Sequence, residues 1–398
     1  MVGSRIKTLL EEVMKAERSR RNREIQRIWQ PASPNTKRFF FGAPRDTRSM
    51  PITVDLEIPM WAKLLDFDVQ QFYTRPEKYL ENLLKISLYK FRTFKDDTEI
   101  GRTIRIWFGV VLEPSLFGLE PVYFSDHSPW IPKQPVIRNE EDLDDLGYPD
   151  FYRSGLMPLA HEFYESISRT VSDDFRVIFP EWDRGPFGMA IALRGMENML
   201  KDTIKRPDFV HKLMKFVTES RIRWTKDRSS FLGHVVEKGD LYDDEVNSPM
   251  LSPTRFQEFV LPYELELCNF HGGIYYWHSC GNIAPLLTQL RKIPILDYLH
   301  VGPWTDLEAV LDVFEKTPLM ICLNPLEDVQ TATDQKIRSK ITRIVNSCLE
   351  RDTPFNIRAD GLQVISTLKR DLVRIRHWIR ISRETIKHMK LDSPSQYD

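Results

Sequence analysis

Residues 274–282 read Ile-Tyr-Tyr-Trp-His-Ser-Cys-Gly-Asn, an apolar and β-prone run that ends in polar groups. The run predicts a buried strand that carries His278 and Cys280 at its carboxyl end. Because side chains two residues apart on an extended chain point to the same face, this imidazole and thiolate can reach one metal ion or one substrate. The structural alternative is a core histidine and a packed cysteine beside a glycine turn.

Outward from this stretch, apolar strand-sized runs alternate with amphipathic helical segments. Strands are expected at 175–179, 231–236, 296–301, 319–323 and 355–357, and helices at 157–171, 207–229, 284–291, 307–315, 334–350 and 368–390. No Gly-x-Gly-x-x-Gly follows any strand, which disfavours a dinucleotide-binding sheet. The alternation therefore predicts an α/β protein with a single (β/α)8 TIM barrel, in which the strand ends share one mouth.

The N-terminal part reads differently from the rest. The first thirty residues predict a charged amphipathic helix, and the residues from 31 to 60 an irregular segment with a short strand at 52–58. We expect residues 1–60 to form a helical and irregular extension packed on a barrel of residues 61–398.

Two further segments complete the expected barrel. A strand is predicted at 107–112, directly before Glu113. The segment 121–150 is rich in proline and acidic residues, and it predicts a long loop inserted over the top of the barrel.

Composition limits the kind of molecule. The chain has 398 residues, of which 41% are hydrophobic and 28% charged, so it can bury a large core. A formal net charge of −1 argues against a nucleic-acid-binding surface. The apolar runs are too short to span a membrane, and four cysteines do not form a disulfide framework. We expect a cytoplasmic protein that binds neither nucleic acid nor membrane, and these features are compatible with a homodimer.

Polar and aromatic residues follow the expected strands. Asp243 and Asp244 could act in catalysis as a further metal ligand or bind a cationic or hydroxyl-bearing substrate, or they could belong to a solvated acidic loop. Arg358 could hold a substrate carboxylate or phenolate through two hydrogen bonds. Aromatic residues near other strand ends suggest an apolar or aryl substrate. Asp306 is a further candidate, but it could simply cap the next helix. These further candidates are Trp182, Tyr276, Trp304 and Asp306.

Several longer motifs carry a family resemblance. They are His-Ser-Cys-Gly-Asn-Ile-Ala-Pro-Leu-Leu from His278, Leu-Ser-Pro-Thr-Arg-Phe-Gln-Glu-Phe at 251–259, Gly-Pro-Trp-Thr-Asp-Leu at 302–307, and Leu-Asn-Pro at 323–325. Residues 155–390 thus resemble the uroporphyrinogen decarboxylase superfamily. The resemblance implies a single-domain (β/α)8 barrel and either a haem-pathway decarboxylase or a cobalamin-dependent methyltransferase.

The two branches need different residues. The decarboxylases carry an N-terminal motif like Trp-x-Met-Arg-Gln-Ala-Gly-Arg, whereas the corresponding run from Arg27 to Ala32 lacks its two spaced arginines and its glycine. The methyltransferases carry a His-x-Cys and a later Cys that bind zinc. His278 and Cys280 match the first two ligands, but Asp360 stands near the third position. Either Asp360 or Cys322 could complete a metal site, or His278 could act without metal as a proton donor or substrate ligand.

The resemblance is closer to the methyltransferase branch. It implies an enzyme that moves a methyl group between a small methylated substrate and cobalamin, with zinc as a second cofactor. The chain lacks the Asp-x-His-x-x-Gly pattern of corrinoid-binding domains, so the cobalamin is expected on a separate corrinoid protein. The alternatives are a decarboxylase that acts on a smaller acid through Arg358, and a noncatalytic barrel that retains a ligand-binding mouth.

Overall fold

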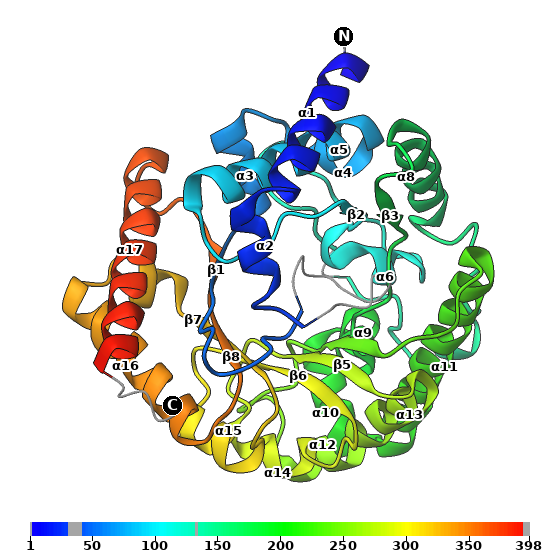
Figure 1. The fold of residues 1–398 in the computed structure, drawn as a ribbon. Coiled ribbons are helices and arrows are strands. Elements are labelled where there is room, and N and C mark those ends of the chain that lie inside the picture. The colour runs from blue at the N-terminus through cyan, green and yellow to red at the C-terminus, as the bar shows by residue number, and fades with distance from the viewer. Residues whose placement is uncertain (1, 31–41, 132–133, 393–398) are drawn as a thin grey trace.

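A ring of strands surrounded by helices forms the centre of the molecule (Figure 1). The computed structural model describes residues 2–30, 42–131 and 134–392. One six-stranded parallel sheet has the order β1 (Ile52–Leu56), β8 (Phe355–Leu362), β7 (Leu319–Leu323), β6 (Leu296–Val301), β5 (Ile274–His278) and β4 (Gly239–Tyr242). A parallel pair, β2 (Thr103–Arg105) with β3 (Arg176–Ile178), continues the ring, because Arg184 after β3 forms a bridge with Tyr242 of β4. The fold is the expected α/β barrel.

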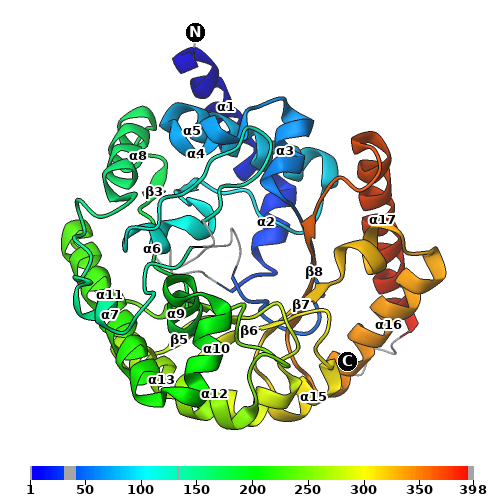
Figure 2. The ribbon, with the colours of Figure 1, turned by 180° about the vertical axis from the view of Figure 1, so that it is seen from behind.

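Helices connect the strands and cover the outside of the ring, as the view from behind also shows (Figure 2). Several begin at sequence signals, such as Pro253 after the N-cap Ser252 and Asp334 after the N-cap Thr333. They are α3 (Ile58–Leu65), α4 (Val69–Thr74), α5 (Pro76–Tyr89), α6 (Leu112–Ser115), α7 (Glu141–Asp144), α8 (Met157–Thr170), α9 (Pro186–Arg194), α10 (Met196–Lys205), α11 (Pro207–Leu232), α12 (Pro253–Phe259), α13 (Leu261–His271), α14 (Leu287–Leu290), α15 (Leu307–Val313), α16 (Asp334–Glu350) and α17 (Leu368–Asp392).

Two expected strands are wrong. Residues 107–112 contain a short 3-10 turn at Gly109–Val111, and the strand there is β2, a few residues earlier. The apolar run 231–236 begins as the end of α11, and the strand that follows is β4. Since β4 carries the buried polar residue Asp240, its sequence lacks the continuous apolar run of a buried parallel strand.

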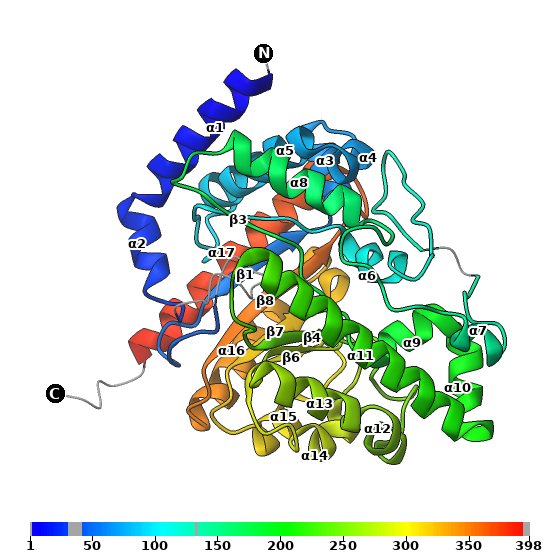
Figure 3. The same cartoon turned by 90° about the vertical axis from the view of Figure 1, so that its right-hand side faces the viewer.

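The N-terminal extension lies against one side of the barrel (Figure 3). It consists of α1 (Val2–Glu17) and α2 (Arg20–Gln26), and the inward face of α1 is buried. Residues 31–41, where the irregular segment was expected to begin, lie outside the described residues. Because β1 pairs with β8, the first barrel strand precedes the expected domain boundary at residue 60.

The insertion expected at 121–150 lies at the other side of the barrel (Figure 3). Its described part is largely irregular, with a bridge between Val122 and Trp130 and the short helix α7. In the described ranges, no helix has the length and apolar character needed to cross a membrane.

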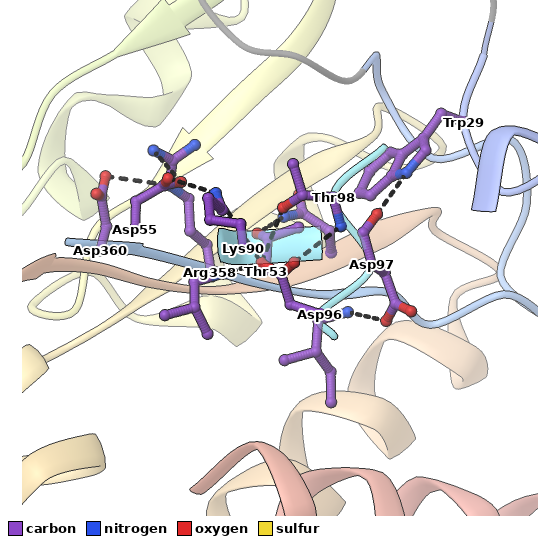
Figure 4. Close-up of polar contacts among 12 residues, drawn as sticks. Trp29, Thr53, Asp55, Lys90, Asp96, Asp97, Thr98, Arg358 and Asp360 are labelled. Atoms are coloured by element: carbon purple, nitrogen blue, oxygen red, sulfur yellow. Dashed lines mark hydrogen bonds and ion pairs between the residues drawn. The ribbon is translucent and has the colours of Figure 1, made fainter. Parts of the chain in front are cut away.

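Carboxylates link β1 to the segment that leads to β2. Ile52 N–H donates to Asp97 Oδ2 (2.8 Å), Val54 N–H donates to Asp96 Oδ2 (2.9 Å), and Asp97 N–H donates to the Ile52 carbonyl oxygen (2.8 Å) (Figure 4). Within the described residues, no strand ladder joins β1 to β2. We call this contact, between residues 52–54 and 96–98, the seam of the barrel.

Candidate functional site

A cavity of about 380 Å³ opens at the carboxyl ends of the barrel strands. It brings together five of the residues expected at a site, and these come from segments far apart in the sequence. They are Asp244, His278, Cys280, Arg358 and Asp360. Active sites of (β/α)8 barrels lie at this face, because the loops after all eight strands meet there.

Asp244, His278 and Cys280 form a possible metal-ligand group. His278 Nε2 lies 3.2 Å from Cys280 Sγ and 3.1 Å from Asp244 Oδ1. One ligand atom from each residue lies within 4.8 Å of the other two. Zinc bonds of about 2.0–2.3 Å in a tetrahedron would hold ligand atoms at roughly these separations. The nitrogen, sulfur and oxygen donors suit zinc, and three protein ligands leave its fourth position for substrate.

The surrounding rings fix the orientation of His278. Its ring stacks on Tyr242 at a centroid distance of 4.7 Å and lies 3.9 Å from the ring of His300. The Tyr276 hydroxyl lies 3.0 Å from His278 Nδ1 and donates to Met320 Sδ at 3.2 Å, so it can accept a hydrogen bond from Nδ1. This arrangement directs Nε2 toward the cavity, as metal-ligating histidines require.

The metal-free group shows how strongly its members interact. Burial alone would raise the pKa of Asp244, but the charge of His278 and hydrogen bonds from His278 and Cys280 hold it below its ordinary value. Burial and the neighbouring Asp244 raise the pKa of the Cys280 thiol. A bound cation would favour the thiolate, since a coordinated thiol loses its proton.

A second charged cluster lines the wall formed by β1 and β8. Arg358 donates to Asp55 (Nη2 to Oδ2, 2.9 Å), and its Nε lies 3.1 Å from Asp360 Oδ2. Lys90 Nζ lies 2.6 Å from Asp55 Oδ1 (Figure 4). Although burial lowers the pKa of Arg358, Asp360 and Asp55 raise it well above its ordinary value.

Sequence reasoning missed many residues of this cavity, among them Asp55, Lys90 and Glu113. Asp55 could have been predicted, because it is a polar residue near the end of the predicted strand 52–58. Lys90 could not, because it lies at the end of a helix and no strand directly precedes it. Glu113 accepts hydrogen bonds from the backbone N–H groups of Asp183 (3.2 Å) and Arg184 (3.3 Å). Burial and the charge of Asp183 raise the pKa of Glu113 to about 7.

Two expected site residues are buried beside the cavity. Asp243 is turned away from it and accepts from the backbone N–H groups of Gly188 (2.5 Å) and Phe187 (3.3 Å) at the start of α9. Burial, Glu245 and Glu264 raise the pKa of Asp243 well above its ordinary value. Tyr276 is a core residue whose contact with the site is its hydrogen bond to His278.

The other expected residues lie elsewhere. Trp182 packs in the core against Phe117 and Trp224. Trp304 and Asp306 line a separate hollow near α16, which Cys322 also borders, but Cys322 is buried in a cluster with Tyr276 and Met320. Asp306 there caps α15 by accepting from the Glu308 N–H at 3.1 Å. These side chains do not line the cavity, because a residue after a strand can turn inward, cap the next helix or face outward.

Comparisons with known proteins give consistent matches. The family model described as Uroporphyrinogen decarboxylase (URO-D) matches residues 70–357. A methylated-thiol--coenzyme M methyltransferase from Methanosarcina mazei is 24% identical over 159 residues, which cover 40% of this chain and 41% of that relative. The chain thus matches less than half the length of this relative. A solved methyltransferase structure from Methanosarcina mazei has a TM-score of 0.59 at 16% identity, covers 84% of this chain and 94% of its own, and supports the same fold.

Proposed function

Because the chain belongs to the uroporphyrinogen decarboxylase family, we propose that it is a zinc-assisted methyltransferase that moves a methyl group between a small methylated substrate and a separate corrinoid protein. The observation that carries the proposal is the ligand group Asp244, His278 and Cys280, which lines the cavity at the barrel mouth. The relative named as a methylated-thiol--coenzyme M methyltransferase supports the same class of reaction.

The proposed site assigns a task to each residue. Asp244, His278 and Cys280 hold the metal, which supplies a Lewis acid for the oxygen, nitrogen or sulfur of the substrate. Tyr276 keeps the imidazole of His278 oriented from behind. In this assignment Asp244 takes the ligand position that the sequence left open between Asp360 and Cys322. Asp360 is engaged by Arg358, and Cys322 is buried in a cluster with Tyr276 and Met320, outside the ligand group.

The decarboxylase alternative has weaker support from the cavity. Binding of a substrate carboxylate requires a cation that can turn toward it. Arg358, the residue expected in that role, already contacts Asp55 and Asp360 within 3.1 Å. An acid substrate would have to compete with both of these carboxylates.

The first experiment tests methyl transfer. The zinc-loaded protein is mixed with a corrinoid protein whose cobalt is reduced, together with a panel of O-, N- and S-methyl donors. We expect the corrinoid absorbance to change with at least one donor, and His278→Ala to abolish the change because it removes a metal ligand. His388→Ala, on the surface of α17, serves as the control and should retain the rate. Release of carbon dioxide from a carboxylated substrate, without transfer from any donor, would establish the decarboxylase alternative.

The second experiment tests the metal site without an activity assay. Cys280→Ser should weaken zinc binding roughly 100-fold or more, because a serine hydroxyl is a poor zinc ligand at neutral pH. Circular dichroism and the melting temperature of the metal-free protein should stay unchanged, since Cys280 is exposed. Cys268→Ser, in α13 and outside the cavity, is the matched control. Equal zinc affinity in the two variants would exclude Cys280 as a ligand.

A further inference from the structure

The lining of the cavity contains more acids than bases. Among the described residues, seven carboxyl side chains and four lysine or arginine side chains line it. Each of the four cations contacts a carboxylate: Lys90 contacts Asp55 (2.6 Å), Arg358 contacts Asp55 (2.9 Å), Arg184 contacts Glu245 (2.5 Å), and Arg105 contacts Glu181 (3.1 Å). An anionic ligand would therefore find each of these cations already paired.

The carboxylates also lie closer to solvent than the cations. On the wall of β1 and β8, the side chains of Asp55 and Asp360 are 27% and 37% exposed, whereas those of Lys90 and Arg358 are 6% and 5% exposed. The two cations, which contact these carboxylates (Figure 4), are thus less accessible to solvent than the carboxylates. A ligand that enters the cavity meets negative oxygen atoms on this wall.

Aromatic rings line the neighbouring part of the same cavity. Trp107, which follows β2, is half-buried, whereas Trp61 on α3 is buried and packs against Tyr89 and Phe94. Tyr79 of α5 fixes the backbone of Trp107, because its hydroxyl accepts a hydrogen bond from the backbone N–H of Trp107 at 3.0 Å. Aromatic faces next to carboxylates favour a cation with apolar substituents, which gains from the ring quadrupole and from charge attraction.

The acidic wall is distinct from the proposed metal site. Zinc with Asp244 and a Cys280 thiolate is formally neutral, so the metal would offset the charges of its own ligands. Asp55 and Asp360 lie outside the ligand group, so a bound metal would leave their carboxylates, which are more exposed than Lys90 and Arg358, facing the ligand.

From this arrangement we propose that the substrate carries an ammonium group, held by Asp55 and Asp360 together with Trp107, at a distance from its reacting methyl group. The inference rests on the proposed function for the statement that the ligand is a methylated compound. The substrate class is then a methyl thioether or methyl ether with a quaternary or protonated nitrogen at its other end. The methyl-bearing sulfur or oxygen would face Asp244, His278 and Cys280.

Three probes of similar size separate charge from shape. They are (2-methylthioethyl)trimethylammonium, its uncharged isostere 3,3-dimethylbutyl methyl sulfide, and the anion 3-(methylthio)propionate. Isothermal titration calorimetry with the zinc-loaded protein should show the cation binding about 10-fold or more tightly than the isostere, and the anion more weakly than both. Raising sodium chloride from 50 to 500 mM should weaken the binding of the cationic probe and of no other probe.

A substitution assigns the preference to the acidic wall. Asp360→Asn should lower the affinity for the cation about 5- to 10-fold and leave that for the uncharged isostere within about 2-fold. Asp312→Asn on exposed α15 removes the same charge outside the cavity and should change neither value. The salt series and the three probes test the proposal on the unmodified protein if the Asp360 variant folds poorly.

The outcomes distinguish this inference from the proposed function. Selective binding of the cation without methyl transfer to a reduced corrinoid protein would support the inference and contradict the methyltransferase. Methyl transfer from the uncharged or anionic probe, with no preference for the cation in binding, would overturn the inference and leave the methyltransferase intact. Equal affinities for all three probes would also overturn it.

Discussion

At the scale of single residues, Glu264 is the clearest case of a buried acid outside the cavity. It lies on α13 beneath β5 and is fully buried. Its Oε1 accepts from Trp277 Nε1–H at 3.0 Å, while Oε2 has no hydrogen-bond partner among the described residues. Burial raises the pKa of Glu264 to about 8, so the folded protein keeps a proton that the unfolded chain releases near pH 4.5.

This proton makes stability depend on pH. The contribution of Glu264 to the free energy of unfolding is complete below about pH 4.5 and is lost as the pH rises toward 8, because only the unfolded state ionises in that window. Glu264→Gln, which keeps an acceptor for Trp277, should remove this loss. At each pH, the free energy of unfolding of the variant is compared with that of the original protein. We expect this difference to shift in favour of the variant by a few kcal/mol, at most about 5, between pH 5 and pH 8.

Urea unfolding at several pH values measures the effect. The control is Glu258→Gln, an exposed residue of α12, for which the difference from the original protein should stay constant with pH. Parallel stability curves for Glu264→Gln and the original protein would show that Glu264 ionises normally in the folded state.

At the scale of elements, sequence pattern located the second half of the barrel well. Strands β6 and β7 begin and end where their apolar runs do, and α16 matches its predicted range because Thr333 caps its start. A run buried on both faces of a parallel strand leaves such a continuous signal. Strand β4 leaves no such signal. Its four residues, Gly-Asp-Leu-Tyr, include a glycine and an aspartate, although all four are buried in the folded protein.

For the candidate site, too, the sequence predicted the residues at the ends of clearly marked strands and missed those that depend on tertiary contacts. Residues at the ends of correctly located strands, such as His278, Cys280 and Arg358, do line one cavity. Asp243 and Asp244 could not be distinguished by sequence, because neighbouring side chains point in opposite directions and only the packing of α9 decides which one turns inward. Lys90 depends on a contact across 35 residues to Asp55, and no local pattern encodes it.

Asn22 is one of two buried residues of helix α2, and it ties the helix to the segment before β2. Asn22 Nδ2–H donates to the Ile100 carbonyl oxygen (2.9 Å), and Asn22 Oδ1 accepts from Ile100 N–H (2.9 Å). Asn22→Ala would leave both backbone groups without this partner in a buried place, and we expect the free energy of unfolding to fall by about 2–4 kcal/mol. Chemical denaturation measures the change.

A matched asparagine gives the comparison. Asn198→Ala on α10 removes one long hydrogen bond to the carbonyl oxygen of Arg194 at the end of α9 (3.4 Å) and should cost about 0.5 kcal/mol or less. Zinc affinity should be unchanged in both variants, because neither residue lines the cavity. A similar loss of stability in both would mean that α2 does not support the barrel through Asn22.

At the scale of the whole molecule, the N-terminal extension and the cavity with the candidate site lie on different sides of the barrel. The N-terminal extension packs on one side of the barrel, and the insertion lies on the side where α9 begins (Figure 3). This division is typical of (β/α)8 barrels, in which the face at the carboxyl ends of the strands carries the chemistry. The described part of the insertion lies apart from α1 and α2, and none of its residues lines the cavity.

The seam has a mechanical consequence for this cavity. Two carboxylates and one backbone hydrogen bond join β1 to the chain that precedes β2, whereas a parallel ladder with one register shift, between Val54 and Leu56, ties β1 to β8. If the ring parts at the seam, Asp55 and Asp360 would move together, away from Trp107 on the far side, with the β1–β8 ladder intact. Such a movement would change the width of the cavity mouth and leave the proposed ligand group Asp244, His278 and Cys280 in place.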